Sequence, residues 1–255
     1  MCELLGFSSF EKRNIKPYLK EFFTHSNSNP NGWGLAEFSG DSVRFNTEAV
    51  SADKSSFLPK LIEDNISSYT VMAHIRRATV GEVDIRNCHP FIGVDSFKRK
   101  WYLMHNGTVF SGTELIGYRE KQDGTTDSQR ILLYLIDSIN AETKKKGTQL
   151  NPFERFRVVE RAIETLSYRN KLNLIIYDGE QMYVHCNMDG TLFYKEEQGG
   201  IIFATVPLDN DLWSPVPLTT LFVYQNGRLR YKGKNHRNEF VEAMGVVTQN
   251  LNYNI

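Results

Sequence analysis

Strand patterns at both ends of the chain surround two long helix patterns in its middle, and this distribution constrains the fold more than any other feature. Residues 127–139 and 153–166 place apolar side chains three or four positions apart, as amphipathic helices do. A shorter capped helix is expected after Ser55-Ser56. Short apolar segments bounded by turn residues predict strands at 3–8, 32–38, 42–45, 69–75, 101–105, 172–177, 181–186, 192–195, 200–205, 221–224 and 228–231. The pattern predicts an α+β fold of two antiparallel sheets with helices packed outside.

Turn chemistry supports antiparallel neighbours in the last third of the chain. Asp178-Gly179, Asp189-Gly190 and Asn226-Gly227 are dipeptides that favour tight hairpins between successive strands. No internal repeat or low-complexity linker divides the 255 residues. The chain is therefore expected to form a single domain over residues 1–255.

Charge and cysteine content exclude several classes of function. The formal net charge is +0 and the pI about 7.0, so no overall field favours nucleic acid or an anionic membrane surface. The sequence contains three cysteines without CxxC spacing, which argues against a disulfide framework and for a reducing compartment. It also contains no run of eighteen apolar residues and no secretion leader. We expect a cytoplasmic protein.

The second residue of the chain, Cys2, is a candidate nucleophile. Methionine before a small residue such as Cys2 is a target for removal, which would make Cys2 the N-terminal residue. Its α-amine then titrates near ~8 and its thiol near ~8.5. Nucleophile and base would come from one residue. If Met1 stays attached, the Cys2 nitrogen is an amide and cannot act as that base.

Five further motifs follow Cys2 in a fixed order. They are His74-Ile75-Arg76-Arg77-Ala78-Thr79, Gly81-Glu82, Asn87-Cys88-His89-Pro90-Phe91, His105-Asn106-Gly107 and Thr125-Thr126-Asp127-Ser128. Together with Cys2 this set resembles the class II glutamine amidotransferases of the N-terminal nucleophile hydrolase superfamily, especially small stand-alone members that begin Met-Cys-Glu-Leu-Leu-Gly. The resemblance implies a four-layer αββα sandwich and a single amidotransferase domain over residues 1–255.

The resemblance also implies how an amide would be attacked. Cys2 would form a γ-glutamyl thioester, and Asn106 with the backbone N–H of Gly107 would form the oxyanion hole. Glycine suits that position because it has no Cβ to block the approach of an oxygen. An Asn-Gly pair is also the commonest hairpin dipeptide, so a plain turn is the alternative.

Three further residues would hold the substrate. Arg76 is expected to bind the α-carboxylate through two parallel hydrogen bonds, with Thr79 as a helper. Asp127 is expected to bind the α-ammonium, and its position before a helix pattern also suits a helix N-cap. Many members of the family have an aromatic residue where this chain has Arg77, so the wall of the pocket differs there.

No cofactor and no metal site are expected. His74, His89 and His105, with Cys88 beside them, match no common zinc-ligand spacing. The expected substrate is a small molecule, either glutamine or a related γ-glutamyl amide. The sequence leaves open a separate synthetase subunit that would consume the ammonia, a homo-oligomer, and a catalytically silent binding or scaffold protein that keeps the fold.

Overall fold

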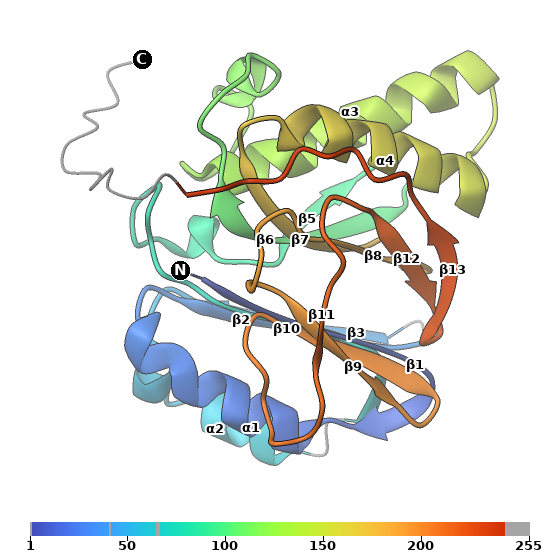
Figure 1. Cartoon of the computed structure of the whole chain (residues 1–255). Coiled ribbons are helices and arrows are strands. Elements are labelled where there is room, and N and C mark those ends of the chain that lie inside the picture. The colour runs from blue at the N-terminus through green and yellow to red at the C-terminus, as the bar shows by residue number, and fades with distance from the viewer. Residues whose placement is uncertain (1, 41, 65–66, 243–255) are drawn as a thin grey trace.

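A computed structural model describes residues 2–40, 42–64 and 67–242, and these form four layers (Figure 1). Two outer helical layers enclose two antiparallel sheets that face each other. The helices are α1 (Lys16–Thr24), α2 (Leu58–Glu63), α3 (Asp127–Lys146) and α4 (Pro152–Ser167). The predicted αββα sandwich is confirmed. No helix in the described ranges is both long and apolar enough to cross a membrane.

Each sheet combines strands from distant parts of the chain. The first sheet has the order β11 (Ser214–Pro215), β9 (Phe193–Glu197), β10 (Gly200–Ala204), β1 (Glu3–Asn14), β4 (Ser67–Ile75), β2 (Trp33–Ser39), β3 (Ser42–Glu48). The second has the order β13 (Arg228–Lys232), β12 (Phe222–Gln225), β8 (Met182–His185), β7 (Lys171–Tyr177), β6 (Lys100–Thr108), β5 (Phe91–Val94). The first strand of the chain is thus central, between β10 and β4.

Alternation along the strands decides which side chains meet between the sheets. Leu4, Met72 and Met104 lie in the cluster that fills the space between the two sheets. Leu5 belongs to the cluster beneath α1 and α2, and Leu103 to the cluster beneath α3 and α4. Because successive residues of a strand point to opposite faces, every second residue from these positions shares the same layer.

The structure contains every strand and helix that the sequence predicts, and among the α-helices and strands of the described residues it adds three. Helix α3 continues to Lys146 and ends at Gly147, whose positive φ of 79° suits glycine. The additional elements are α1, β5 and β11. Helix α1 has no side-chain N-cap to mark its start, β5 buries only its first residue, and β11 has two residues, so none of the three carries a clear sequence pattern.

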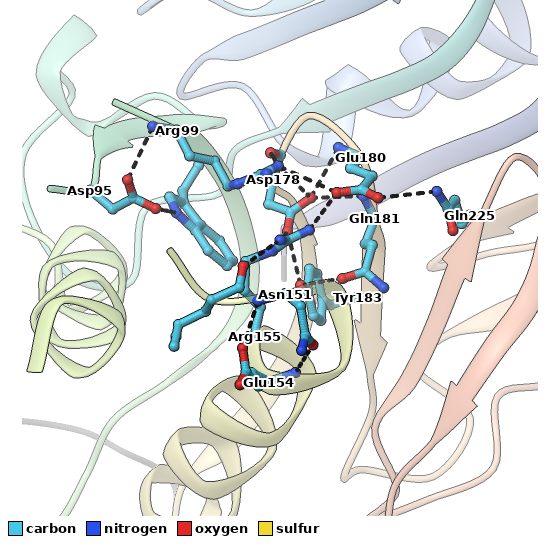
Figure 2. A network of polar contacts seen from close by, with 12 residues as sticks. Asp95, Arg99, Asn151, Glu154, Arg155, Asp178, Glu180, Gln181, Tyr183 and Gln225 are labelled. Atoms are coloured by element: carbon cyan, nitrogen blue, oxygen red, sulfur yellow. Dashed lines mark hydrogen bonds and ion pairs between the residues drawn. The ribbon is translucent and has the colours of Figure 1, made fainter. Parts of the chain in front are cut away.

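A buried polar network fixes α4 to the turn between β7 and β8 (Figure 2). The Asp178 carboxylate accepts hydrogen bonds from the backbone N–H groups of Glu180 and Gln181, at 3.0 and 2.7 Å. Its other oxygen accepts from Arg155 Nε at 2.7 Å and from the Tyr183 hydroxyl at 2.9 Å. The Asp178-Gly179 hairpin is therefore confirmed, and its aspartate also pairs with a buried guanidinium. The hairpin expected at Asp189-Gly190 is wrong, because the strands on either side of it, β8 and β9, lie in different sheets.

Candidate active site

The ends of three strands bring the predicted nucleophile, anchor and oxyanion donor to one end of the inter-sheet space. Cys2 immediately precedes β1 and is on the same face of the first sheet as Leu4, which packs between the sheets. Arg76 immediately follows β4 and is on the same face as Met72. In the second sheet, Asn106 on β6 is on the same inter-sheet face as Met104. Register places Glu3 opposite Ile75, so Cys2 and Arg76 are neighbours across the ladder.

The Cys2 thiol is held by the backbone of Arg77. The Arg77 N–H donates to Sγ at 3.3 Å, and the thiol donates to the Arg77 carbonyl at 3.4 Å. Burial raises the pKa of the Cys2 thiol, while the bond to Arg77 and the charge of Arg76 lower it and the charge of Asp127 raises it. Arg76 and Asp127 therefore both act on the charge of the sulfur, and the half-buried Cys2 thiol, neutral when protonated, needs a base before it can attack.

Asn106 and Gly107 lie inside a paired strand. Asn106 is opposite Asn173 and Gly107 is opposite Leu172 on β7, so the hairpin-turn alternative is wrong. Asn106 is 1% exposed, and its amide nitrogen has no hydrogen-bond partner among the described residues. Buried donors are nearly always paired, so this orphan donor is a group that awaits an acceptor.

Glycine at position 107 is required by the closeness of β7. A Cβ there would lie 2.0 Å from the carbonyl oxygen of Lys171 and 2.4 Å from Nε2 of His105. The His105 ring bonds the same carbonyl at 3.1 Å and the Ser128 hydroxyl at 3.0 Å. His105 thus bonds strand β6 both to β7 and to the first turn of α3, next to the position of Asn106.

Asp127 is the first residue of α3, and the N-cap is Thr126. The Thr126 hydroxyl accepts from the Gln129 N–H at 3.3 Å, so the N-cap role expected of Asp127 is wrong. Asp127 is 4% exposed, and Oδ2 accepts from the Val109 N–H at 2.7 Å. Its carboxylate is thereby tied to the segment that immediately follows the Asn106-Gly107 pair.

The Arg76 guanidinium lies buried within the loop that follows it. It donates from Nη1 to the Glu82 carbonyl at 2.8 Å and from Nη2 to the Val80 and Gly81 carbonyls at 3.0 and 3.3 Å. Thr79, in the same loop, is exposed. The arginine thus shapes residues 80–82 and places a fixed positive charge beside Cys2.

Asn87 joins two of the loops that carry motifs. Its Nδ2 donates to the Glu82 carbonyl at 2.9 Å and to the Thr125 hydroxyl at 3.0 Å, and its Oδ1 accepts from the Thr125 N–H at 2.8 Å. Gly124 permits this approach, because a Cβ there would lie 2.2 Å from Asn87 Oδ1. The motifs are therefore distant in sequence and adjacent in space.

The histidines of the motifs are buried and neutral. The rings of His74 and His89 are in contact, tilted by 34° with centroids 4.1 Å apart, and burial lowers the pKa of His74 to about 3 and that of His89 well below its usual value. The backbone of His89 reaches the first sheet at Gly34, where a Cβ would lie 1.8 Å from the His89 carbonyl. In the described part of the chain, no group of three or more His, Cys, Asp or Glu side chains is placed to hold a metal ion.

Lys171 is the residue near this site that sequence patterns did not indicate. It is 4% exposed, starts β7, and is paired with Thr108 next to Gly107. Its only sequence signal is a charged residue at the edge of an apolar strand, and such residues are usually exposed.

Comparisons with known proteins agree with this arrangement. Residues 1–198 match the family described as class-II glutamine amidotransferases. A Haemophilus influenzae protein named as a candidate glutamine amidotransferase is 30% identical over 190 residues, which are 73% of this chain and 63% of that protein. The chain thus spans less than two thirds of that relative.

Two solved structures have the same fold. A predicted glutamine amidotransferase from Pseudomonas aeruginosa PA01 superposes with a TM-score of 0.62 at 21% identity, over 89% of this chain and 99% of that one. Glutamine phosphoribosylpyrophosphate amidotransferase from B. subtilis, complexed with ADP and GMP, gives 0.66 at 15% identity, over 92% of this chain and 49% of that one.

Proposed function

This chain belongs to the class II glutamine amidotransferases, and on that premise we propose that it hydrolyses the side-chain amide of glutamine or of a related γ-glutamyl amide. The observation that carries the proposal is the buried amide nitrogen of Asn106, which has no hydrogen-bond partner in the described part of the chain and lies on the inter-sheet face of β6. An unpaired donor beside a thiol suits an oxyanion hole, whose acceptor forms only during the reaction. We further propose that residues 1–255 act as one domain.

The proposed reaction begins after Met1 is removed. The free amine of Cys2 takes the thiol proton, and Sγ attacks the side-chain amide carbon of the substrate. The carbonyl oxygen gains the negative charge and accepts hydrogen bonds from Asn106 Nδ2 and the Gly107 N–H. The C–N bond then breaks, the amine of Cys2 returns the proton to the leaving nitrogen, and ammonia or an amine departs. Water cleaves the resulting thioester to give glutamate and the free thiol.

Two charged residues give the site its selectivity in this proposal. The α-carboxylate binds at Arg76, with Thr79 at the pocket edge, and the α-ammonium binds at Asp127. Arg76 and Asp127 already act electrostatically on Cys2, which supports their placement around one small substrate. The arginine would then share its donors between the substrate and the carbonyls of residues 80–82.

The fate of the ammonia separates two versions of the proposal. In the first version, a separate synthetase consumes the ammonia that this chain releases. Alternatively, the chain cleaves a γ-glutamyl amide outright. We place either activity in the cytoplasm, where the free thiols of Cys2, Cys88 and Cys186 would stay reduced.

Hydrolysis of a panel of γ-glutamyl amides tests the proposal. The protein is first confirmed by intact mass to begin at Cys2, and glutamate release is then measured with glutamine and with N-substituted γ-glutamyl amides. Turnover that disappears in Cys2→Ala, with an unchanged melting temperature, supports the proposal. No turnover from processed protein would favour the silent binding or scaffold alternative.

A further inference from the structure

Residues 233–242 form a strap that leaves β13 and runs beside α4 toward the end of the sandwich where β1 begins (Figure 1). None of these residues belongs to a helix or strand, yet the strap is bonded to its neighbours along its length. The His236 N–H donates to the Thr219 carbonyl at 2.9 Å, and the Phe240 N–H donates to the Asn187 carbonyl at 2.7 Å. The strap is therefore held by tertiary contacts, and segments held in this way can open locally without global unfolding.

A pair of histidines fastens the middle of the strap to the second sheet. Nε2 of His236 lies 3.0 Å from Nε2 of His185 on β8, so one nitrogen donates and the other accepts. Nδ1 of His185 lies 2.6 Å from the Leu172 carbonyl oxygen, which only accepts, so this nitrogen carries a proton. Nδ1 of His236 accepts from the Asn238 N–H at 3.1 Å and therefore carries none. The contacts thus assign the bridging proton to Nε2 of His236, with both rings neutral.

This arrangement has no place for a second proton on either ring. A protonated imidazole has two donors and no acceptor. A protonated His236 would direct its Nδ1–H at the Asn238 N–H, and a protonated His185 would direct its Nε2–H at the Nε2–H of His236. In each case two donors would face each other, and a buried donor without an acceptor is unfavourable. The bond between the histidines therefore requires that both rings are neutral.

The surroundings of the pair also favour the neutral rings. Burial lowers the pKa of His185 to about 3, and His236 and His105 lower it further. Burial likewise lowers the pKa of His236, although Glu164 and Glu160 of α4 raise it. The charged side chains of the strap itself are exposed, and they are Lys234, Arg237, Glu239 and Glu242. A His236 ring released into water would therefore bind a proton more readily than the fastened ring does.

The fastened strap reaches the candidate active site at two points. The Leu172 carbonyl, which accepts from His185, belongs to the register partner of Gly107 on β6. Further along the strap, the ring of Phe240 stacks on that of Phe110, with centroids 5.5 Å apart and planes at 8°. Phe110 lies three residues after Gly107. The histidine pair therefore connects the strap to the strand that carries the candidate oxyanion hole.

We propose that the bond between His185 and His236 is a pH-sensitive fastening, which holds the strap beside the candidate active site at neutral pH and weakens in acid. A histidine in water titrates near ~6.5. Above that pH the released His236 is neutral too, so the fastening has its full strength. Below it, the released ring takes up a proton that the fastened ring, with its lower pKa, does not. The ratio of fastened to released strap therefore falls about tenfold per pH unit.

Hydrogen–deuterium exchange of the full chain, followed by mass spectrometry from about pH 5 to about pH 8, tests the fastening. Protection is expressed relative to the intrinsic exchange rate at each pH and is read from the peptide that contains His236 and Phe240. It should be constant above about pH 6.5 and fall about tenfold per pH unit below it. Peptides of β7 should stay better protected than the strap at every pH, because the strap opens without the rest of the fold.

Two substitutions of His236 separate the bond from the titration. In His236→Gln the side-chain amide can still donate to His185 but does not titrate, so the strap should stay protected at pH 8 and lose its pH dependence. In His236→Ala the bond is absent, and protection should be reduced even at pH 8. His236 is half-buried on a segment without secondary structure, so both variants should fold.

His25 supplies the matched control. It is also a half-buried histidine, and its Nδ1 lies 2.8 Å from Glu3 Oε2, but it follows α1 in the helical layer of the first sheet. His25→Gln should therefore leave the pH profile of the strap unchanged.

Four results would overturn the inference. The first three are a flat wild-type profile, a slope that persists in His236→Gln, and wild-type protection of His236→Ala at pH 8. The fourth is an equal loss of protection in the strap and in β7, because the strap would then open only by global unfolding. Exchange is measured without substrate, so none of these outcomes depends on hydrolysis or on the proposed function.

Discussion

Two asparagines that face each other across β6 and β7 should respond in opposite ways to truncation. Asn106 has a buried amide nitrogen without a partner among the described residues. Asn173, its register partner, donates to the Thr191 hydroxyl at 2.7 Å and accepts from the Asn187 N–H at 3.2 Å. Asn106→Ala should therefore lower activity strongly with little change in stability, and Asn173→Ala should reduce stability.

The structure sets the expected magnitudes. An unsatisfied buried polar group costs about 1–3 kcal/mol, so its removal from Asn106 offsets the packing lost in Asn106→Ala. The free energy of unfolding should then stay within about 1 kcal/mol of wild type. Loss of an oxyanion donor should lower kcat about 100- to 1,000-fold. Asn173→Ala leaves the Thr191 hydroxyl and the Asn187 N–H without their partner and should lower the free energy of unfolding by about 1–3 kcal/mol. Each kcal/mol corresponds to a fall of roughly 2–4 °C in melting temperature.

Urea denaturation and steady-state kinetics on the same preparations measure both quantities. The reasoning is refuted if Asn106→Ala destabilises the protein as much as Asn173→Ala does, because Asn106 would then be a structural residue. It is equally refuted if Asn106→Ala keeps wild-type kcat.

Three further results are expected. Arg76→Lys should raise KM more for substrates with a free α-carboxylate than for their esters, and equal losses on both would contradict the anchoring role. Asp178→Asn should cost on the order of 3 kcal/mol, measured by urea denaturation, because it removes the buried carboxylate that bonds Arg155 Nε and leaves this arginine with the carboxylate of Glu180 alone. Burial holds the pKa of His74 and His185 near about 3, below the ordinary 6.5. As the pH falls below about 6.5, these histidines take up protons in the unfolded chain but not in the folded one. The free energy of unfolding should therefore be unaffected by them above about pH 6.5 and fall by about 1.4 kcal/mol per pH unit per histidine toward pH 3. A urea midpoint that does not change with pH would contradict this.

The long elements could be predicted because their patterns are strong. Helices α3 and α4 bury regular apolar stripes, and α4 begins with a full capping box at Asn151 and Glu154. The strand alternation also predicts which residues share a layer. Helix α1 was missed because its N-cap residue, Ile15, has no capping side chain that would mark the start of a helix in the sequence.

The site was only partly predictable for a different reason. Sequence order groups Arg76 with Thr79, yet the Arg76 guanidinium bonds the carbonyls of residues 80–82, and Thr79 is exposed. Backbone carbonyls have no residue signature, so this contact is invisible in the sequence. Lys171 was missed because its burial depends on the pairing of β7 with β6, a long-range contact.

Covalent labelling of Cys2 tests the central claim most directly. Processed protein is treated with a glutamine analogue that carries a chloroketone in place of the side-chain amide, and the modified peptide is identified by mass. If Cys2 is the nucleophile, one adduct should form, on Cys2; excess glutamine should prevent it, and the Asp127→Asn variant should form it more slowly. Labelling that glutamine does not slow, or that falls on Cys88 or Cys186 as readily as on Cys2, would contradict it.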